Sequence, residues 1–151
     1  NRLEGVSRSG RSIWFSASLG GASSAGQIFE YVPDTETEDT GRLILQYEVA
    51  DRSVVSCPDN LVVTPWGELL MAEDNYHAGG GCTHQHLRVM TRSGEVYDLA
   101  RNRINFPERG QAGAEFTGAC FSPDGRVLFV NLQRPEHVTV AIMGPWPEGG
   151  V

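Results

Sequence analysis

Three acidic residues recur along this sequence at nearly equal spacing. Glu4, Asp59 and Glu115 are separated by 55 and 56 positions, and each leads into the first predicted strand of a repeating unit. If the units are arranged radially, acids at the repeat period point toward a shared centre. Carboxylate oxygens are the ligands that hard cations such as calcium prefer. The spacing therefore predicts a central site to which each unit contributes one carboxylate.

The composition fits one folded domain with an acidic surface. The chain has 151 residues, 40% of them hydrophobic, and a formal net charge of −7, which excludes disordered and fibrous classes. Nucleic acid is disfavoured as a partner because phosphate backbones bind clusters of Lys and Arg, and none is visible. An acidic excess usually serves solvation, but it is also what a site for several cations needs.

No run of residues approaches the length of a membrane span, so no membrane span is expected. The sequence begins Asn1-Arg2, without Met and without a basic, apolar leader. We expect a processed protein or part of a longer one, with any export signal lying outside this sequence.

Glycine turns repeat with the same period as the acids. Three segments, 9–15, 66–71 and 124–129, align on their glycines, which are 57 and 58 positions apart. Short strands, regular turn signals and a repeat of this size are typical of a β-propeller, whose blades are four-stranded sheets around a channel. The chain is therefore divided into repeat units of roughly 1–50, 51–108 and 109–151.

The clearest unit is residues 115–133, where a Ser-Pro-Asp-Gly sequence separates two apolar runs. Pro123 presets φ for a turn, Asp124 can bond its own backbone, and Gly125 accepts the positive φ of a tight reversal. This segment is predicted to form a β-hairpin that begins at Glu115.

The remaining pattern is all-β, with no sustained helical period. Further strands are expected at residues 13–19, 27–32, 43–49, 59–64, 68–73, 85–91, 95–99 and 137–143. The result is a β-propeller-like chain of about three blades. Natural propellers have roughly four to eight blades, so either a missing half or a second copy of the chain is expected to close the ring.

The cysteines are odd in number and cannot form a closed disulfide framework. Cys120 lies between Ala119 and Phe121 in a predicted strand, which indicates a buried, small apolar residue. A disulfide between Cys57 and Cys82 is left open as an alternative.

Cys82, His84 and His86 alternate along the chain, which would place a zinc-type ligand set on one face of a strand. Structural zinc sites usually take ligands from two separate segments, so ordinary loop and strand histidines are the simpler interpretation. His77 and His137 have no partner that the sequence identifies.

Several motifs resemble the C-terminal part of PhoX-type alkaline phosphatases, a family of exported propeller proteins. The resemblance covers nearly the whole chain in order. It rests on Arg-Leu-Glu-Gly at 2–5, Cys-Pro-Asp-Asn-Leu at 57–61, and the segments 65–74, 86–88, 93–97, 99–102, 115–125 and 144–146.

This resemblance implies a six-bladed propeller, of which the chain is about half. It also implies a central site that holds calcium and iron and hydrolyses phosphate monoesters in the periplasm or outside the cell. In that picture Glu4, Asp59 and Glu115 are metal ligands and Arg2 binds phosphate. The family's iron-binding Cys and further Glu ligands match no position here, so the chain alone is expected to bind metals poorly and to be inactive.

The chemistry suits these residue types. Clustered cations neutralise the charge of a phosphate, lower the pKa of a bound oxygen nucleophile and stabilise the leaving group. The planar guanidinium of Arg2 can bond two phosphate oxygens at once.

Simpler interpretations stand beside this one. An acid before a strand is most often a turn former or a surface charge. Asn60, next to Asp59, could contact a metal or phosphate, but it could equally cap the turn.

For the whole chain, the alternative to a phosphatase is a non-catalytic, propeller-derived structural module that self-associates through open blade edges. A calcium-dependent lactonase is a third, weaker hypothesis that rests on fold analogy.

Overall fold

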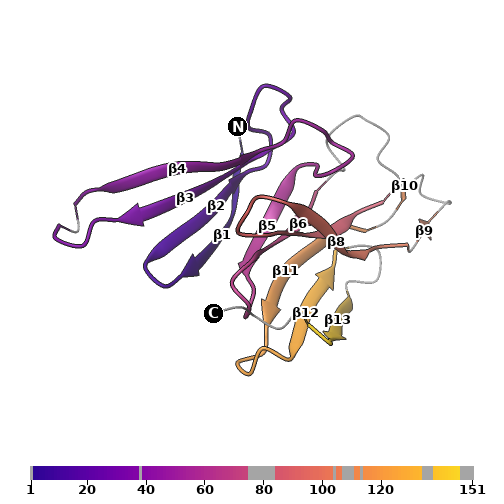
Figure 1. Ribbon diagram of the computed structural model, residues 1–151. Coiled ribbons are helices and arrows are strands. Elements are labelled where there is room, and N and C mark those ends of the chain that lie inside the picture. Colours follow the sequence, from indigo (N-terminus) through magenta and orange to yellow (C-terminus); the bar gives the residue numbers. More distant parts are fainter. Residues whose placement is uncertain are drawn as a thin grey trace.

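The computed structural model describes residues 2–37, 39–74, 84–103, 105–106, 111–112, 114–133 and 138–146. The described residues form strands, turns and loops, and none of them is helical. Accordingly, the described part has no helix long and apolar enough to cross a membrane. The prediction of an all-β chain that resembles part of a propeller is confirmed by three antiparallel sheets (Figure 1).

Each sheet follows the order of the chain, so that hairpins connect its neighbouring strands. The first sheet contains β1 (Leu3–Ser9), β2 (Ser12–Ala17), β3 (Gln27–Pro33) and β4 (Gly41–Glu48). The second contains β5 (Pro58–Val63), β6 (Leu69–Glu73), β7 (His86–Met90) and β8 (Val96–Arg101). The third contains β11 (Phe116–Phe121), β12 (Val127–Leu132) and β13 (Val138–Met143), and β9 (Asn105–Phe106) pairs with β10 (Gln111–Ala112).

The three sheets lie next to one another and do not form a closed ring (Figure 1). Their first strands are neighbours, because β1 packs against β5 and β5 packs against β11. This arrangement is that of successive propeller blades, in which the first strand of each sheet lies innermost.

Glycine conformation explains the turn between the first two strands of each sheet. Gly10, Gly67 and Gly125 have φ of 56°, 81° and 71°, a region that side chains other than glycine rarely adopt. The Gly125 amide also donates to the Ser122 carbonyl at 2.8 Å. The predicted hairpin and the predicted positive φ of Gly125 are therefore both confirmed.

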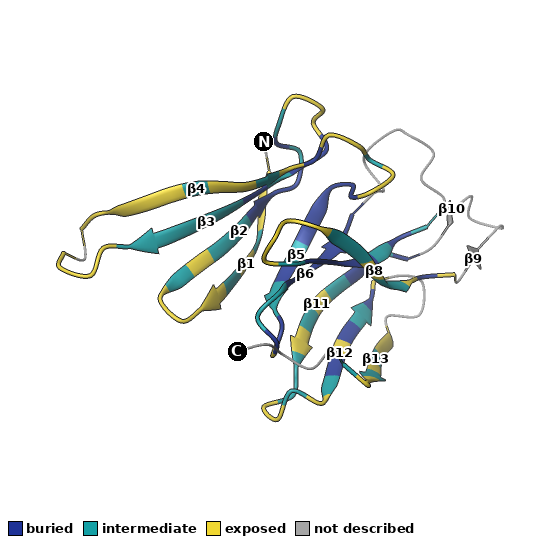
Figure 2. Ribbon diagram, in the orientation of Figure 1, coloured by how far each residue is buried: buried dark blue, intermediate teal, exposed yellow. Residues whose placement is uncertain are grey.

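Two hydrophobic clusters hold the sheets together, and β6 contributes to both. Leu69 and Met71 belong to the cluster shared with the first sheet, whereas Leu70 and Ala72 belong to the cluster shared with the third. Because side chains alternate along a strand, β6 is buried on both faces (Figure 2). The second sheet is thus the centre of the described structure.

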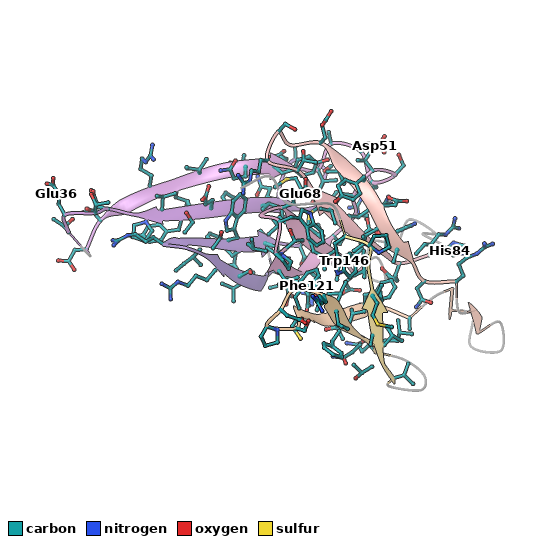
Figure 3. The ribbon with its side chains drawn as sticks, turned by 60° about the horizontal axis from the view of Figure 1, so that its bottom comes forward. Glu36, Asp51, Glu68, His84, Phe121 and Trp146 are labelled. Carbon is teal, nitrogen blue, oxygen red and sulfur yellow. The ribbon has the colours of Figure 1, made fainter. Side chains whose placement is uncertain are left out.

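Three aromatic rings join the turn ends of the second and third sheets. The Trp66 ring stacks on Trp146 at a centroid distance of 5.6 Å, and Phe121 meets both rings edge-on. Phe121 and Trp146 lie side by side in Figure 3. Such pairs add specific ring contacts to the area that they bury.

The expectation for Cys120 was wrong, because its side chain is exposed. Cys120 pairs with Phe129, which is itself 39% exposed, so both face the uncovered side of the third sheet. Cys57 is buried and free. Its proposed disulfide partner, Cys82, lies outside the described residues.

Candidate functional site

The three recurrent acids lie at corresponding places in the three sheets. Glu4 is in β1, Asp59 is in β5, and Glu115 directly precedes β11. The charge of Glu4 acts on Asp59, and Glu115 forms a side-chain hydrogen bond with Asp59. The structure therefore brings all three carboxyl groups together at one end of the innermost strands.

Backbone irregularities accompany the acids. The ladder shifts register between Leu3 and Val6 in β1 and between Pro58 and Asn60 in β5, so Glu4 and Asp59 both lie within a bulge. A third shift occurs between Thr117 and Cys120 in β11. A β-bulge bends its strand and redirects a side chain. Bulges can thus redirect the side chains of Glu4 and Asp59, whereas Glu115 precedes the bulge of its strand.

Polar side chains bind the innermost strands to each other beside the acids. Ser16 Oγ donates to the Asp59 carbonyl at 2.8 Å and accepts from the Gly5 amide at 3.1 Å. On the other side of β5, Asn60 Oδ1 accepts from the Gly118 amide at 2.7 Å and from Thr117 Oγ1 at 3.2 Å. In this structure Asn60 joins β5 to β11, which neither sequence interpretation of this residue anticipated.

Asp59 has an unusual environment for a carboxylate. It is 7% exposed, and its Oδ1 atom is buried without a hydrogen-bond partner. Its Oδ2 atom accepts from Asn60 Nδ2 at 2.9 Å. Burial raises the pKa of Asp59, the charges of Glu4 and Asp74 raise it further, and hydrogen bonding with Glu115 and Asn60 opposes the rise only in part.

A buried carboxyl group with an unpaired oxygen and other carboxyl groups beside it makes a site that favours a positive charge. A hydrogen bond between two carboxyl groups requires that one of them hold a proton, because two close carboxylates repel each other. A cation would replace that proton and would also satisfy the unpaired Asp59 oxygen. The all-oxygen donor set of Glu4, Asp59 and Glu115 suits a hard cation such as calcium, so these residues fit the expected group.

In this structure the side chains of Glu4, Asp59 and Glu115 are not arranged around one point. Among the residues that the structure describes, no group of three or more His, Cys, Asp or Glu could hold a metal ion as placed. Ligation by all three acids would require their side chains to rotate.

Arg2 lies at the same end of the first sheet. Its Nε atom is 2.7 Å from Glu4 Oε1, and its Nη1 atom is 3.7 Å from Asp74 Oδ2. The Arg2 side chain is 44% exposed, so part of the guanidinium faces solvent. A cationic fork beside clustered acids can bind an anion that bridges them.

Asp74 is a member of this cluster that the sequence pattern did not reveal. It follows β6, outside the series of acids that precede first strands, so the repeat period gave no signal for it. The backbone pairing could have found it, because Asp74 directly follows Glu73, which lies opposite Pro58 at the start of β5.

The two described histidines, His84 and His86, each lie beside a charged side chain. His86 Nδ1 lies 3.0 Å from Glu73 Oε2, and Arg88 Nε donates to Glu73 Oε1 at 3.1 Å. Burial lowers the pKa of His86, with Arg88 as the next cause. His84 Nδ1 lies 2.7 Å from Arg101 Nη2. The third member of the hypothetical zinc set, Cys82, lies outside the described residues, as do His77 and His137.

Comparison with known proteins gives one family. A family model described as alkaline phosphatase PhoX matches residues 2–136, a span that includes all three acids, Arg2 and Asp74. No curated protein and no solved structure matches the chain.

Proposed function

The chain belongs to the PhoX family of alkaline phosphatases, and we propose that it contributes to a metal-dependent phosphomonoesterase centre. The observation that supports this most directly is the buried Asp59 carboxyl group, with an unpaired oxygen and the Glu4, Asp74 and Glu115 side chains nearby. A protein that buries like charges together is expected to bind a counter-ion there.

In this proposal Glu4, Asp59 and Glu115 hold calcium and iron, and Arg2 binds the phosphate of the substrate. When bound, the cations supply charge neutralisation for the phosphoryl group. Arg2 orients that group with its N–H donors. These donors lie near the carboxylates, and part of the guanidinium faces solvent. The Ser16 and Asn60 hydrogen bonds hold the strands that contain Glu4 and Asp59 next to each other and next to β11, so only the acid side chains have to rotate when a cation binds.

We assign this activity to the periplasm or the extracellular space, as the family resemblance implies. The chain by itself is expected to bind cations weakly, because affinity depends on the number and preorganisation of ligands. Further blades, from the rest of the protein or from a second copy, would supply additional ligands.

Hydrolysis of p-nitrophenyl phosphate, with calcium and ferric iron supplied, tests the proposal. Because the chain alone is expected to be inactive, the assay uses the protein with its further blades present. In that protein the wild type should show metal-dependent turnover, and Glu115→Gln should lower it at least about tenfold, as loss of a ligand to the reacting charge does. Glu36→Gln is the matched control, since Glu36 is exposed on the β3–β4 loop (Figure 3). Absence of metal-dependent turnover, or equal loss in both variants, would contradict the proposal.

One observation favours the second candidate, a self-associating module, although through a sheet face and not through the open blade edges expected from the sequence. Register across the first sheet aligns Val6, Phe15, Phe29 and Leu45 on its outer face. Val6 is 66% exposed and Leu45 is 48% exposed, and the Phe15 and Phe29 rings stack at 5.4 Å. An apolar sheet face of this kind is typical of a surface that another sheet covers.

Light scattering over a range of concentrations separates this candidate from a monomer. Self-association through this face predicts a mass that rises with concentration and returns to that of the monomer in Leu45→Glu. Arg42→Glu, which changes an exposed residue of the same strand β4, is the control. A constant monomeric mass for the wild type would exclude the module.

A further inference from the structure

Asp74 is fixed in place by the backbone of the second sheet. Its amide donates to the Cys57 carbonyl at 2.9 Å, directly before the strand β5 that contains Asp59. The residue is 7% exposed. Because its amide is bonded to the second sheet and the residue is buried, the Asp74 carboxylate has little freedom to move beside the acid cluster.

Arg2, by contrast, begins the first sheet and has a long, half-exposed side chain. Its guanidinium meets carboxylates from two different sheets, Glu4 at Nε and Asp74 at Nη1. A planar guanidinium has five N–H donors in a fixed geometry. The short contact at Nε and the longer ionic attraction at Nη1 orient the guanidinium and leave its other donors for another acceptor.

We propose that Asp74 is a positioning residue that holds the Arg2 guanidinium toward the acid cluster, in the orientation that accepts a phosphate group. Glu4 alone cannot do this, because Glu4 lies only two residues from Arg2 along the chain and moves with it. Asp74 directly follows β6, so its contact with Arg2 orients the guanidinium relative to the second sheet, which contains Asp59. This inference rests on the proposed function for its substrate, but the Arg2–Asp74 contact stands on geometry alone.

The distinctive consequence concerns substrate binding. An arginine that is not held in place can still bind phosphate, but it must lose its rotational freedom on binding. Asp74→Asn keeps the shape of the side chain and removes its charge. The variant should raise KM for p-nitrophenyl phosphate and the dissociation constant of inorganic phosphate by roughly tenfold, while kcat changes by less than about twofold.

Asp124→Asn is the matched control, because Asp124 also pairs with an arginine, Arg126, at an exposed turn of the third sheet. It should leave both constants unchanged. The shift in the melting temperature of Asp74→Asn on adding calcium should stay near that of the wild type. Loss of the calcium shift in Asp74→Asn would overturn the proposal, because Asp74 would then be a cation ligand.

A second readout does not depend on activity. The Nη signals of the Arg2 guanidinium in ¹⁵N NMR should shift, and their exchange with water should accelerate, in Asp74→Asn but not in Asp124→Asn, because Nη1 is the Arg2 atom that faces Asp74. An unchanged Arg2 signal would overturn the proposal. If the wild type hydrolyses no phosphate monoester, the proposed function fails, whereas the Arg2 signal still decides whether Asp74 positions the guanidinium.

Discussion

Tyr97 and Trp66 share one acceptor at the turn end of the second sheet. The Tyr97 hydroxyl donates to Glu68 Oε2 at 2.7 Å, and Trp66 Nε1 donates to the same oxygen at 2.8 Å. Burial is the main cause that raises the pKa of Tyr97 to about 12, and the hydrogen bond to Glu68 is the next. The neutral phenol is therefore favoured in the folded state.

This shift predicts a loss of stability at alkaline pH. An unfolded tyrosine ionises near pH 10, so the contribution of Tyr97 is fully present below pH 10 and is lost as pH rises through about 12. The melting temperature of the wild type should fall more steeply between these values than that of Tyr97→Phe. Parallel curves for the two proteins would show that Tyr97 remains neutral in both states or ionises equally in both.

At the residue scale, the repeat period located Glu4, Asp59 and Glu115, which the structure brings together. Their role as metal ligands remains a proposal. The same period could not locate Asp74, because Asp74 enters the cluster through strand pairing and not through a repeated position. The role of Asn60 was also inaccessible, since its partners on β11 lie 57 and 58 positions away.

At the scale of elements, turn chemistry and alternation predicted the hairpins. Ser-Pro-Asp-Gly and the glycine turns specify local backbone geometry, so β11 and β12 were predictable from neighbouring residues. The bulges arise in the pairing of β1 with β2, β5 with β6 and β11 with β12, and no turn residue or alternation marks them. The exposure of Cys120 escaped prediction for a related reason, because strand type does not tell which face of a sheet is covered.

Gly5 tests how closely the innermost strands approach. A Cβ atom at Gly5 would overlap the backbone of β5 at Asp59, Asn60 and Leu61. Gly5→Ala should therefore separate β1 from β5 and destabilise the protein by about 3 kcal/mol or more. Urea unfolding followed by tryptophan fluorescence measures this loss.

Gly10→Ala provides the comparison for Gly5→Ala. Gly10 has no atom near its Cβ position, and its φ is 56°, so the only penalty is the left-handed backbone, of about 1 to 2 kcal/mol. Equal losses in the two variants would contradict the close approach of β1 and β5.

At the scale of the whole molecule, the three described sheets lie next to one another, as the prediction of a partial propeller requires. A repeat with one turn glycine and one acid per unit implies similar units placed side by side. The period does not give the number of blades in a closed ring. The outer face of the first sheet carries Phe29 and Leu45, and the second candidate function predicts that another surface covers it.

The central claim is that the acid cluster is a cation site. The most direct test compares the melting temperatures of the wild type and Asp59→Asn with and without millimolar calcium. Without calcium, Asp59→Asn should be the more stable protein, by about 1 kcal/mol or roughly 3 °C, because it removes a buried charge among like charges. Calcium should raise the melting temperature of the wild type and leave that of Asp59→Asn unchanged. Equal calcium shifts in both proteins, or none in the wild type, would contradict the account.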